Sequence, residues 1–375
     1  MEDKELFLAL LNTPSITPND GGLLAFIEDY LPDFKAIRVD VDDVKNLFLY
    51  KKFGNGPHFC FAGHVDVVPP GEGWSSDPFE PIEKDGFVYA RGAQDMKSGI
   101  CAILQVCKNV THFNGTLSIL LTSDEEGDAK NGTVKVLETL KEVNLLPDFA
   151  LIAEPTCEKN FGDTIKIGRR GSINGTVELI GEQGHAAYSQ NVKNPIHQIS
   201  TILPKLAEHA FDEGDSIFAP SKLIITNIKA GEGVTNITPK TLKLMFNVRN
   251  SPLTKIENIE RYIRSIFGLL YMVNNPGKDK LNFDLELKES AKPFLTDKSS
   301  ILIAHLSRAV EEITGLVPEL SAAGGTSDAR FFAEFGVSVA EFGVLNDTIH
   351  AADERCHLSH LYGLINVFKA LIEKF

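Results

Sequence analysis

The chain has 375 residues, of which 43 % are hydrophobic and 23 % charged, so it has the composition of a globular protein and the length for two domains. Its formal net charge of −14 argues against a nucleic-acid partner, because such proteins usually present a basic patch. No apolar run approaches the roughly 20 residues of a membrane-spanning helix, and the acidic start does not resemble a signal peptide. Five scattered cysteines form no CxxC pair and favour reduced thiols, so we expect a cytoplasmic protein without a membrane partner.

The first part of the chain alternates short apolar runs with helical patterns. Buried strands are expected at "HFCFAGH" (58–64), "TLSILLTS" (116–123) and "FALIAEP" (149–155), and a helix at "MKSGICAILQVCKNV" (96–110). Strand–helix–strand alternation of this kind predicts an α/β layered domain with a mostly parallel sheet.

The pattern changes after residue 172, where strands alternate apolar and polar side chains. Asn194 and Pro195 have the form of a helix start, and Pro204 is expected to interrupt that helix. The order of the expected elements is β-α-β-β-α-β, which predicts an inserted ferredoxin-like domain with one solvated face. Its strands are expected at 173–181, 222–230, 241–249 and 281–288, and its second helix at 255–271.

From about residue 290 the chain returns to helices and a buried strand, at 299–314, 337–343 and 357–375. We therefore expect it to re-enter the first domain. The predicted division is a catalytic domain of 1–172 and 290–375, with an inserted lid or dimerisation domain of 173–289.

Acidic and histidine side chains follow the expected buried strands. His64 and Asp66 are two residues apart at the end of one strand, where the carboxylate could accept the second ring N–H of a ligating histidine. The alternative is a core histidine satisfied by a nearby acid. Asp95 precedes the expected helix at 96–110, where an acid is more usually an N-cap than a ligand.

"TSDEEGD" (122–128) places four acids after another buried strand. The adjacent Glu125 and Glu126 cannot point the same way on an extended backbone, so one could face a metal ion and the other a water. A solvated turn is the alternative, and it remains the interpretation of Asp124 and Asp128.

Glu154 ends an apolar strand, where an unpaired carboxylate is costly unless a cation compensates it. His350 follows a strand far away in the sequence. Because most of these side chains follow strands, they could converge on one rim of the sheet, where α/β folds place their sites.

These stretches resemble the zinc aminoacylase and carboxypeptidase superfamily, in the family's order and over almost the whole chain. The motifs are "GHVDVVPPGEGW", "ARGAQDMKSG", "TSDEEG", "AEPT", "GEQGHAAYS" and "IHAADE". The resemblance implies two divalent ions, both Zn²⁺ or with Co²⁺ in one position. It also implies a role for each residue: His64 and Glu154 on one ion, Glu126 and His350 on the other, Asp95 between them, Asp66 supporting His64, and Glu125 as catalytic base. Mixed histidine and carboxylate ligands suit Zn²⁺, and two ions about 4 Å apart suit hydrolysis.

Finer motifs resemble the bacterial enzymes that release succinate from an N-succinyl diamino acid, a small substrate with several carboxylates. This resemblance implies substrate contacts from Arg169, Ser172, Tyr188, Asn236, Arg249, Gly325, Thr326 and Asn346. It also implies that His185 acts across a homodimer, formed through the inserted domain, on the reaction's oxyanion. Arginine's planar guanidinium suits carboxylates, although only one of the adjacent Arg169 and Arg170 need face the site.

Two other interpretations stay open at this point. A related amide hydrolase, such as an acetylornithine deacetylase or a dipeptidase, would share the same metal ligands. A non-catalytic metal-dependent binding protein would also share them, but it would have no need of a base at Glu125.

Overall fold

The computed structural model describes residues 1–274 and 283–375, and the chain divides into two compact units. Unit 1 comprises Met1–Gly168, Leu295–Ser321 and Ser327–Phe375, and unit 2 comprises Arg169–Phe294 and Ala322–Thr326. Each unit is described by itself below.

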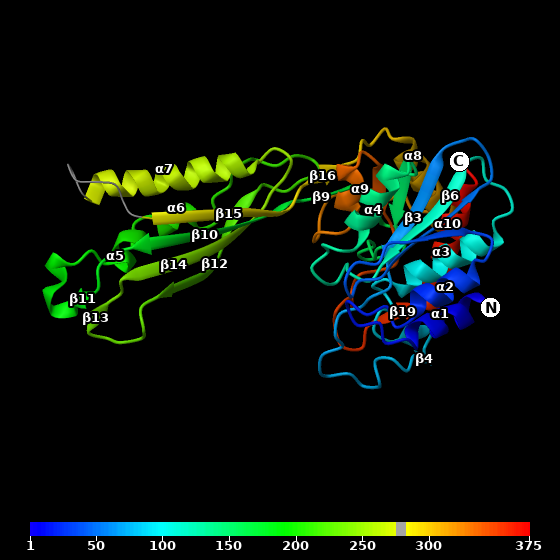
Figure 1. Ribbon diagram of the computed structural model, residues 1–375, viewed down its shortest axis with the longest axis horizontal. Helices are drawn as coiled ribbons and strands as arrows, with labels where there is room; N and C mark the ends of the chain where they lie inside the picture. Colours follow the sequence, from blue (N-terminus) through cyan, green and yellow to red (C-terminus); the bar gives the residue numbers. More distant parts are fainter. Residues whose placement is uncertain (275–282) are drawn as a thin grey trace. The chain divides into compact units, whose positions relative to one another are not determined.

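Unit 1 is built on a mixed eight-stranded sheet with the order β1-β2-β6-β3-β7-β18-β8-β17 (Figure 1). The four central strands β6, β3, β7 and β18 pair in parallel, while β1 with β2, β2 with β6, and β18 with β8 pair antiparallel. The strands are β1 (Lys35–Arg38), β2 (Asn46–Lys52), β3 (His58–His64), β6 (Thr116–Thr122), β7 (Phe149–Ile152), β8 (Thr164–Lys166), β17 (Glu319–Ser321) and β18 (Ser338–Glu341). The expected α/β class with a mostly parallel central sheet is confirmed.

Helices pack against both faces of this sheet. On one side α3 contacts α1 and α10, and α10 contacts α8; on the other side α4 contacts α9 (Figure 1). The helices are α1 (Asp3–Leu11), α2 (Leu23–Tyr30), α3 (Lys97–Asn109), α4 (Thr133–Glu142), α8 (Ile301–Thr314), α9 (Ala329–Glu334) and α10 (Leu358–Ile372). Three short strands, β4 (Ile82–Lys84), β5 (Phe87–Tyr89) and β19 (Arg355–His357), form a separate small sheet.

The centre of unit 1 is apolar because β3 is covered on both faces. Phe59 and Phe61 are fully buried, and the Phe61 ring lies 5.1 Å from that of Phe368 on α10. Burial on both faces explains why this strand is a continuous apolar run in the sequence rather than an alternating one. Since β3, β6 and β7 are parallel neighbours, the residues that follow them meet at one rim of the sheet.

Unit 2 contains an antiparallel four-stranded sheet with the order β12-β14-β10-β15. Its elements follow the order strand, helix, strand, strand, helix, strand, apart from two very short strands. They are β10 (Ser172–Ile180), β11 (Gly184–His185), a 3₁₀ helix η1 (Ala186–Asn191), α5 (Pro195–Ser200), α6 (Leu203–Leu206), β12 (Lys222–Ala230), β13 (Ile237–Thr238), β14 (Thr241–Arg249), α7 (Ile256–Asn274) and β15 (Phe283–Ala291). The strand expected at 281–288 is described only from Phe283, because Leu281 and Asn282 lie outside the described residues. Two further short strands, β9 (Gly168–Arg169) and β16 (Phe294–Leu295), lie where the chain passes between the units.

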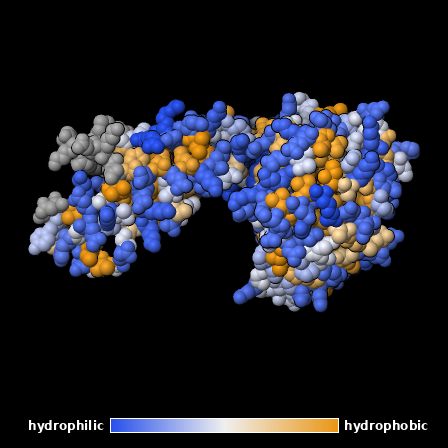
Figure 2. All heavy atoms as spheres, in the orientation of Figure 1, coloured by the Kyte–Doolittle hydropathy of each residue, from blue (hydrophilic) through white to orange (hydrophobic). Residues whose placement is uncertain are grey.

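One face of the unit 2 sheet forms a core and the other meets solvent. Leu244 and Phe246 of β14 belong to a buried cluster that includes Ile263 and Phe267 of α7. Met245, between them on β14, is exposed, as is Ile228 of the edge strand β12. Figure 2 accordingly shows separate hydrophobic patches among polar atoms over this unit.

The expected helix start and interruption in unit 2 are both present. The Asn194 side chain accepts a hydrogen bond from the Ile196 N–H, and Pro195 occupies the first helical position of α5. The helix stops at Ser200 and restarts at Leu203, one residue before Pro204, because proline offers no N–H to a continuing helix.

Gly99 of α3 permits a close approach that supports the rim of the sheet. A Cβ at this position would lie 2.4 Å from the Ala153 carbonyl oxygen, next to Glu154. Gly99→Ala should therefore destabilise unit 1 by about 1–3 kcal/mol through overpacking, although alanine favours helices.

Gly268 is the matched control, because it also lies inside a helix but a Cβ there would contact nothing within 4 Å. Gly268→Ala should stabilise unit 2 by up to about 1 kcal/mol. Urea unfolding of both variants measures the difference. A Gly99→Ala protein as stable as the unsubstituted one would contradict the close packing of α3.

Candidate metal centre

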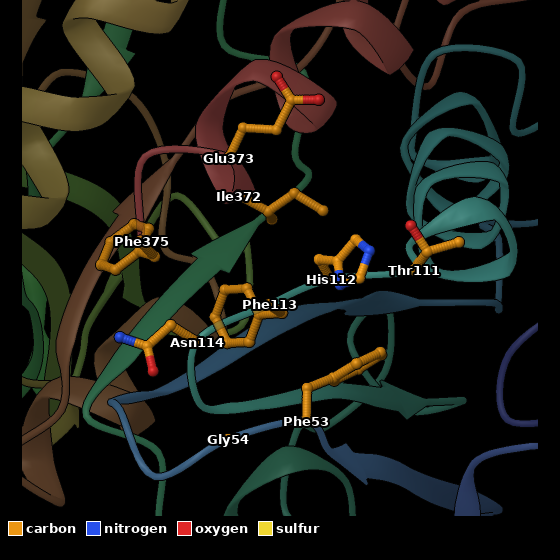
Figure 3. Close-up of a pocket in the computed structure, with 9 residues that line it drawn as sticks. All are labelled: Phe53, Gly54, Thr111, His112, Phe113, Asn114, Ile372, Glu373 and Phe375. Atoms are coloured by element: carbon orange, nitrogen blue, oxygen red, sulfur yellow. The ribbon is translucent and has the colours of Figure 1, made fainter.

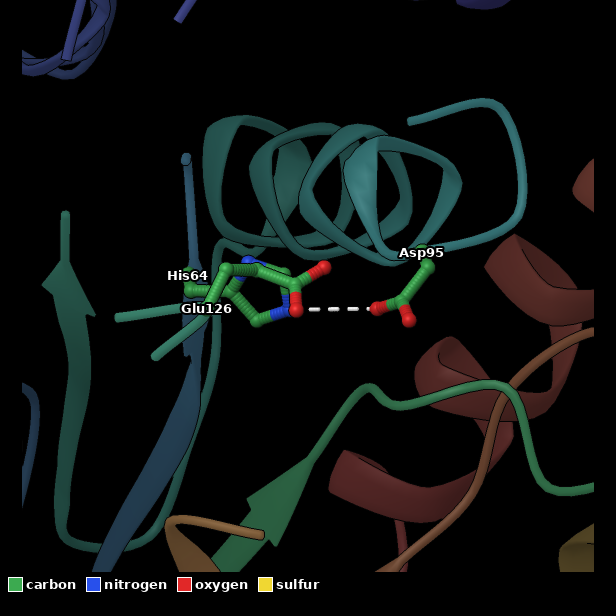
Figure 4. Close-up of side chains that lie close together, drawn as sticks. All are labelled: His64, Asp95 and Glu126. Atoms are coloured by element: carbon green, nitrogen blue, oxygen red, sulfur yellow. Dashed lines mark hydrogen bonds and ion pairs between the residues drawn. The ribbon is translucent and has the colours of Figure 1, made fainter. Parts of the chain in front are cut away.

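Five segments of unit 1 bring acidic and histidine side chains to the carboxyl ends of β3, β6 and β7. His64 is the last residue of β3, Glu125 and Glu126 follow β6, and Glu154 follows β7. Asp95 lies just before α3, and His350 belongs to the loop between β18 and β19. The structure therefore brings together all the residues proposed from the sequence as metal ligands. Three of them are drawn in Figure 4, where His64 and Asp95 face one another.

His64 and His350 both contact Asp95 but through different oxygens. The His64 Nε2 lies 3.1 Å from Asp95 Oδ1, and the His350 Nε2 lies 3.3 Å from Asp95 Oδ2. The Asp95 carboxylate thus stands between the two imidazoles.

Each imidazole also has a glutamate partner of its own. Glu154 Oε1 lies 3.5 Å from His64 Nε2, while Glu126 Oε1 lies 2.9 Å from His350 Nε2. The result is two neighbouring groups of donors, His64 with Glu154 and His350 with Glu126, which share Asp95.

The adjacent Glu125 and Glu126 have different neighbours. Carboxylate oxygens of Glu125 and Glu154 and a nitrogen of His64 lie within 4.8 Å of one another. A Glu126 oxygen lies within the same distance of His64 and Asp95, and Glu126 also contacts His350. Both glutamates are only partly exposed. Both residues lie in the turn after β6 and not on the extended backbone expected from the sequence, so strand alternation is not the reason for their different contacts.

Asp66 supports the cluster differently from the expected contact. His64 Nδ1 lies 2.8 Å from the main-chain oxygen of Asp66, which accepts its hydrogen, while the nearest Asp66 carboxylate oxygen lies 3.6 Å away. The strand ends at His64, and the irregular backbone that follows presents the Asp66 carbonyl to the ring. The Asp66 carboxylate instead accepts a hydrogen bond from the Glu126 N–H at 3.2 Å. With Nδ1 donating, Nε2 is the nitrogen left for a cation.

The N-cap interpretation of Asp95 and the solvated-turn interpretation of Asp124 do not describe the contacts of these acids. The N-cap position of α3 is Met96, which makes no side-chain capping bond, and the Asp95 carboxylate meets the two imidazoles instead. Asp124 is buried rather than solvated, and it accepts hydrogen bonds from the Lys130 and Asn131 N–H groups at 2.9 Å each. The solvated-turn expectation is therefore wrong for Asp124, whose carboxylate is buried against the backbone of its own turn, whereas Asp128 is exposed as expected.

Burial and crowding shift the proton affinities of the cluster. Burial disfavours the His64 imidazolium, but the Asp95 and Glu154 carboxylates outweigh it and raise the pKa of His64 well above its ordinary value. Hydrogen bonds to Asp95 and Glu126 raise the pKa of His350 to about 10. Burial, together with the charge of Asp95, raises the pKa of Glu154 to about 7, and burial with the charge of Glu154 raises the pKa of Glu125 well above its usual range.

The donor set fits divalent cations. Asp66, Asp95, Glu125, Glu126 and Glu154 lie around two imidazoles, and the Oδ1 atom of Asp66 is buried without a hydrogen-bond partner. Buried carboxylates that raise one another's pKa lack sufficient positive charge, which a cation would supply. Mixed imidazole and carboxylate ligands are those of zinc and related transition metals.

The residues expected to bind substrate lie mostly in unit 2. His185, Tyr188, Asn236 and Arg249 are exposed there, and the His185 Nδ1 accepts a hydrogen bond from the Ala187 N–H. Ser172 is buried at the start of β10. Gly325 and Thr326 fall in the short segment 322–326 that belongs to unit 2, whereas Asn346 belongs to unit 1.

The two adjacent arginines of unit 2 differ in their surroundings. Arg169 is buried, and its Nη1 donates to the Ala323 carbonyl oxygen at 3.2 Å. Burial and the nearby charge of Arg249 lower the pKa of Arg170, so Arg170 lies close to Arg249.

Arg91 and Glu354, which received no role from the sequence, lie beside the cluster. Both side chains are buried, and Arg91 Nη1 donates to Glu354 Oε2 at 2.6 Å. The two residues stand in the motifs "ARGAQDMKSG" and "IHAADE", which are far apart in the chain. The sequence could have drawn attention to them, because each is a charged residue in a motif that also holds a proposed metal ligand.

A separate cavity of about 530 Å³ lies at the other end of the central strands (Figure 3). It is lined by residues that precede β6 or follow β2, together with the end of the chain: Phe53, Gly54, Thr111, His112, Phe113, Asn114, Ile372, Glu373 and Phe375. The acidic cluster follows the opposite end of β6, so this cavity is distinct from it.

Among the described residues, no helix has the length and apolarity to span a membrane.

Comparison with known proteins agrees with this arrangement. The model of peptidase family M20/M25/M40 matches residues 60–374. A succinyl-diaminopimelate desuccinylase of a Nitratiruptor species is 56 % identical over 375 residues, covering 100 % of both chains. Among solved structures, the M20 family metallo-carboxypeptidase Sso-CP2 of Sulfolobus solfataricus has a TM-score of 0.80 at 16 % identity, covering 100 % of this chain and 99 % of its own. The Bacillus subtilis YXEP protein, a dinuclear metal binding peptidase, has a TM-score of 0.72 at 16 % identity, covering 99 % and 96 %.

Metal binding to this cluster should depend steeply on pH. In the metal-free protein the raised pKa values of His64 and His350 keep both imidazoles protonated at neutral pH. A cation must displace those protons, so the affinity for zinc should rise roughly tenfold per pH unit for each proton released, up to the pKa of the imidazole concerned.

Calorimetric titration of the metal-free protein with zinc between about pH 6 and 9, in buffers of different ionisation enthalpy, measures both the affinity and the protons released. An affinity that does not change with pH would contradict the protonated state of the imidazoles.

Proposed function

The chain belongs to peptidase family M20/M25/M40 and is a metal-dependent amidohydrolase, and on that premise we propose that it hydrolyses N-succinyl-LL-2,6-diaminopimelate to succinate and LL-2,6-diaminopimelate. The 56 % identity to the Nitratiruptor desuccinylase over the full length of both chains carries the proposal of this substrate. The cluster around Asp95 supports the class of reaction.

Two divalent ions, zinc or zinc with cobalt, would be held by the two donor groups. His64 with Glu154 would hold one ion and His350 with Glu126 the other, and Asp95, whose two oxygens face different imidazoles, would contribute to both. The dinuclear metal binding of the Bacillus subtilis YXEP protein, which shares the fold, supports this number. When bound, such ions polarise an amide carbonyl and make a water more acidic.

Glu125 is the proposed catalytic base. It lies beside His64 and Glu154 but is not needed by either donor group, and its partly buried carboxylate, crowded by Glu154, has a raised pKa. It would take the proton of the attacking water at its carboxylate and deliver that proton to the nitrogen of the leaving amine. Asp66 would keep His64 and the Glu126 loop in place through its main-chain oxygen and its carboxylate.

Unit 2 would supply recognition of the substrate. The carboxylates of the substrate call for guanidinium and hydroxyl donors, which Arg169, Arg249, Ser172, Tyr188 and Thr326 offer. Asn236, Gly325 and Asn346 complete the proposed contacts, and His185 of a second subunit would stabilise the oxyanion. A homodimer formed through unit 2 and a cytoplasmic location belong to the same proposal, and the five buried free thiols support a reducing compartment.

Glu125→Gln should lower kcat by a factor of about 10²–10⁴, because the amide cannot accept the proton, while the bound metal stays at the unsubstituted level. Steady-state kinetics and elemental analysis of the same preparation measure the two quantities. Asp128→Asn is the matched control, since Asp128 lies in the same turn but is exposed and pairs with Lys130. Retained turnover in a metal-loaded Glu125→Gln protein would refute the role of Glu125.

The substrate is tested by comparing kcat/KM for N-succinyl-LL-2,6-diaminopimelate, N-acetylornithine and a dipeptide. We expect the succinylated substrate to be favoured at least roughly 100-fold, because a site built for charged groups rejects substrates that lack them. Preference for N-acetylornithine or for the dipeptide would assign the chain to another activity of the family. Zinc binding without hydrolysis of any of the three would instead favour a binding protein.

A further inference from the structure

The Glu354 carboxylate receives four hydrogen bonds from the loop that carries Asp95. Its Oε1 accepts from the Gln94 and Asp95 N–H groups at 2.8 and 3.0 Å. Its Oε2 accepts from the Gly92 N–H at 3.0 Å and from Arg91 Nη1 at 2.6 Å. The side chain of Glu354 is fully buried, so these contacts are not exchanged with water. One carboxylate therefore fixes the backbone of the loop up to Asp95 itself.

The same two loops are joined at further points. The Gln94 side chain donates to Asp347 Oδ1 at 2.6 Å and accepts from the Thr348 N–H and hydroxyl at 2.9 and 2.8 Å. Arg91 Nη2 donates to the main-chain oxygen of His350 at 3.4 Å. The loop of Asp95 and the loop of His350 are thus held directly to one another by side-chain hydrogen bonds.

His350 needs such support more than His64 does. His64 ends a buried strand and is 1 % exposed, whereas the His350 side chain is 49 % exposed and lies in a loop. His350 also has a φ of 59°, in the left-handed region that is unfavourable for residues with a side chain. Its imidazole faces Asp95 and Glu126 only while the surrounding loop keeps this conformation.

We propose that Glu354 is a positioning residue of the metal centre, which holds Asp95 and the His350 loop in register so that the second donor group, His350 with Glu126 and Asp95, is preformed. The inference rests on the proposed two-ion site. Glu354 acts through hydrogen bonds to the backbone and to Arg91, and it is not itself a ligand.

The charge of Glu354 is part of this role. An amide at the same position would keep one acceptor oxygen. In either orientation its NH₂ group would face two donors, which are Arg91 and the Gly92 N–H or the Gln94 and Asp95 N–H groups. Donors would then oppose donors in a buried site, so Glu354→Gln should loosen the loop without changing its volume.

The test is calorimetric titration of the metal-free full-length protein with zinc. The unsubstituted protein should bind two ions. In Glu354→Gln the affinity for one ion should fall roughly 10- to 100-fold, the usual effect of removing a group that orients a ligand, and the affinity for the other should fall by a smaller factor because Asp95 contributes to both. Thermal unfolding of the metal-free variants shows whether each is folded.

Asp353→Asn is the matched control. Asp353 is the adjacent carboxylate in the same loop, but it accepts hydrogen bonds from the N–H and hydroxyl of Ser75. Its substitution should leave both zinc affinities unchanged. If Asp353→Asn weakens the second ion as much as Glu354→Gln does, general loosening of the loop replaces the specific role of Glu354.

A folded Glu354→Gln protein that binds two zinc ions with unchanged affinities overturns the inference and leaves the proposed function standing. Fewer than two ions on the unsubstituted protein overturns the two-ion site, and this inference with it.

If Glu354→Gln does not fold, Thr348→Val decides the question, because it removes only the hydroxyl bond to Gln94 and that to the Arg355 N–H. A fall of about fivefold in the second affinity supports the inference, and no fall overturns it.

Discussion

The packed core of the parallel strands β3, β6 and β7 holds the metal centre of unit 1 together, because it keeps mutually repelling carboxylates beside His64 and His350. Acids on four different chain segments approach two imidazoles, and the raised pKa values of Glu125 and Glu154 record how poorly their charges are balanced. Such a cluster persists only if the surrounding fold is stable enough to impose it. The buried parallel strands β3, β6 and β7 meet this need, because their packed core holds the residues that follow them at one rim. A cation would convert this repulsion into binding free energy.

The support of the cluster is divided between strands and loops. His64 and Glu154 extend from strands of the central sheet, whereas Asp95 and His350 depend on hydrogen bonds between two loops. This difference makes the two donor groups unequal: one is fixed by the core, and the other is fixed by Arg91, Gln94 and Glu354.

The sequence was most informative where burial dictates a pattern. The apolar runs of β3, β6 and β7 and the helical spacing of α3 follow from burial on both sides, and Asn194 and Pro204 mark a helix start and a break for local reasons. The antiparallel strands β1, at the edge of the sheet, and β2, next to it, were not anticipated. Other features could not be read from the sequence: the hydrogen bond of His64 to the Asp66 carbonyl, the left-handed backbone of His350, and the pairing of the distant Arg91 and Glu354 depend on the folded chain. Resemblance to a family supplied the ligand set, which spacing alone left open.

In the proposed function Asp95 would stand between two metal ions. Anomalous diffraction at the zinc absorption edge, from crystals grown with zinc, locates each ion independently of the protein atoms. Two zinc positions are expected, one beside His64 and Glu154 and one beside His350 and Glu126, with Asp95 in contact with both. A single zinc ion, or two ions that do not share Asp95, would contradict this expectation.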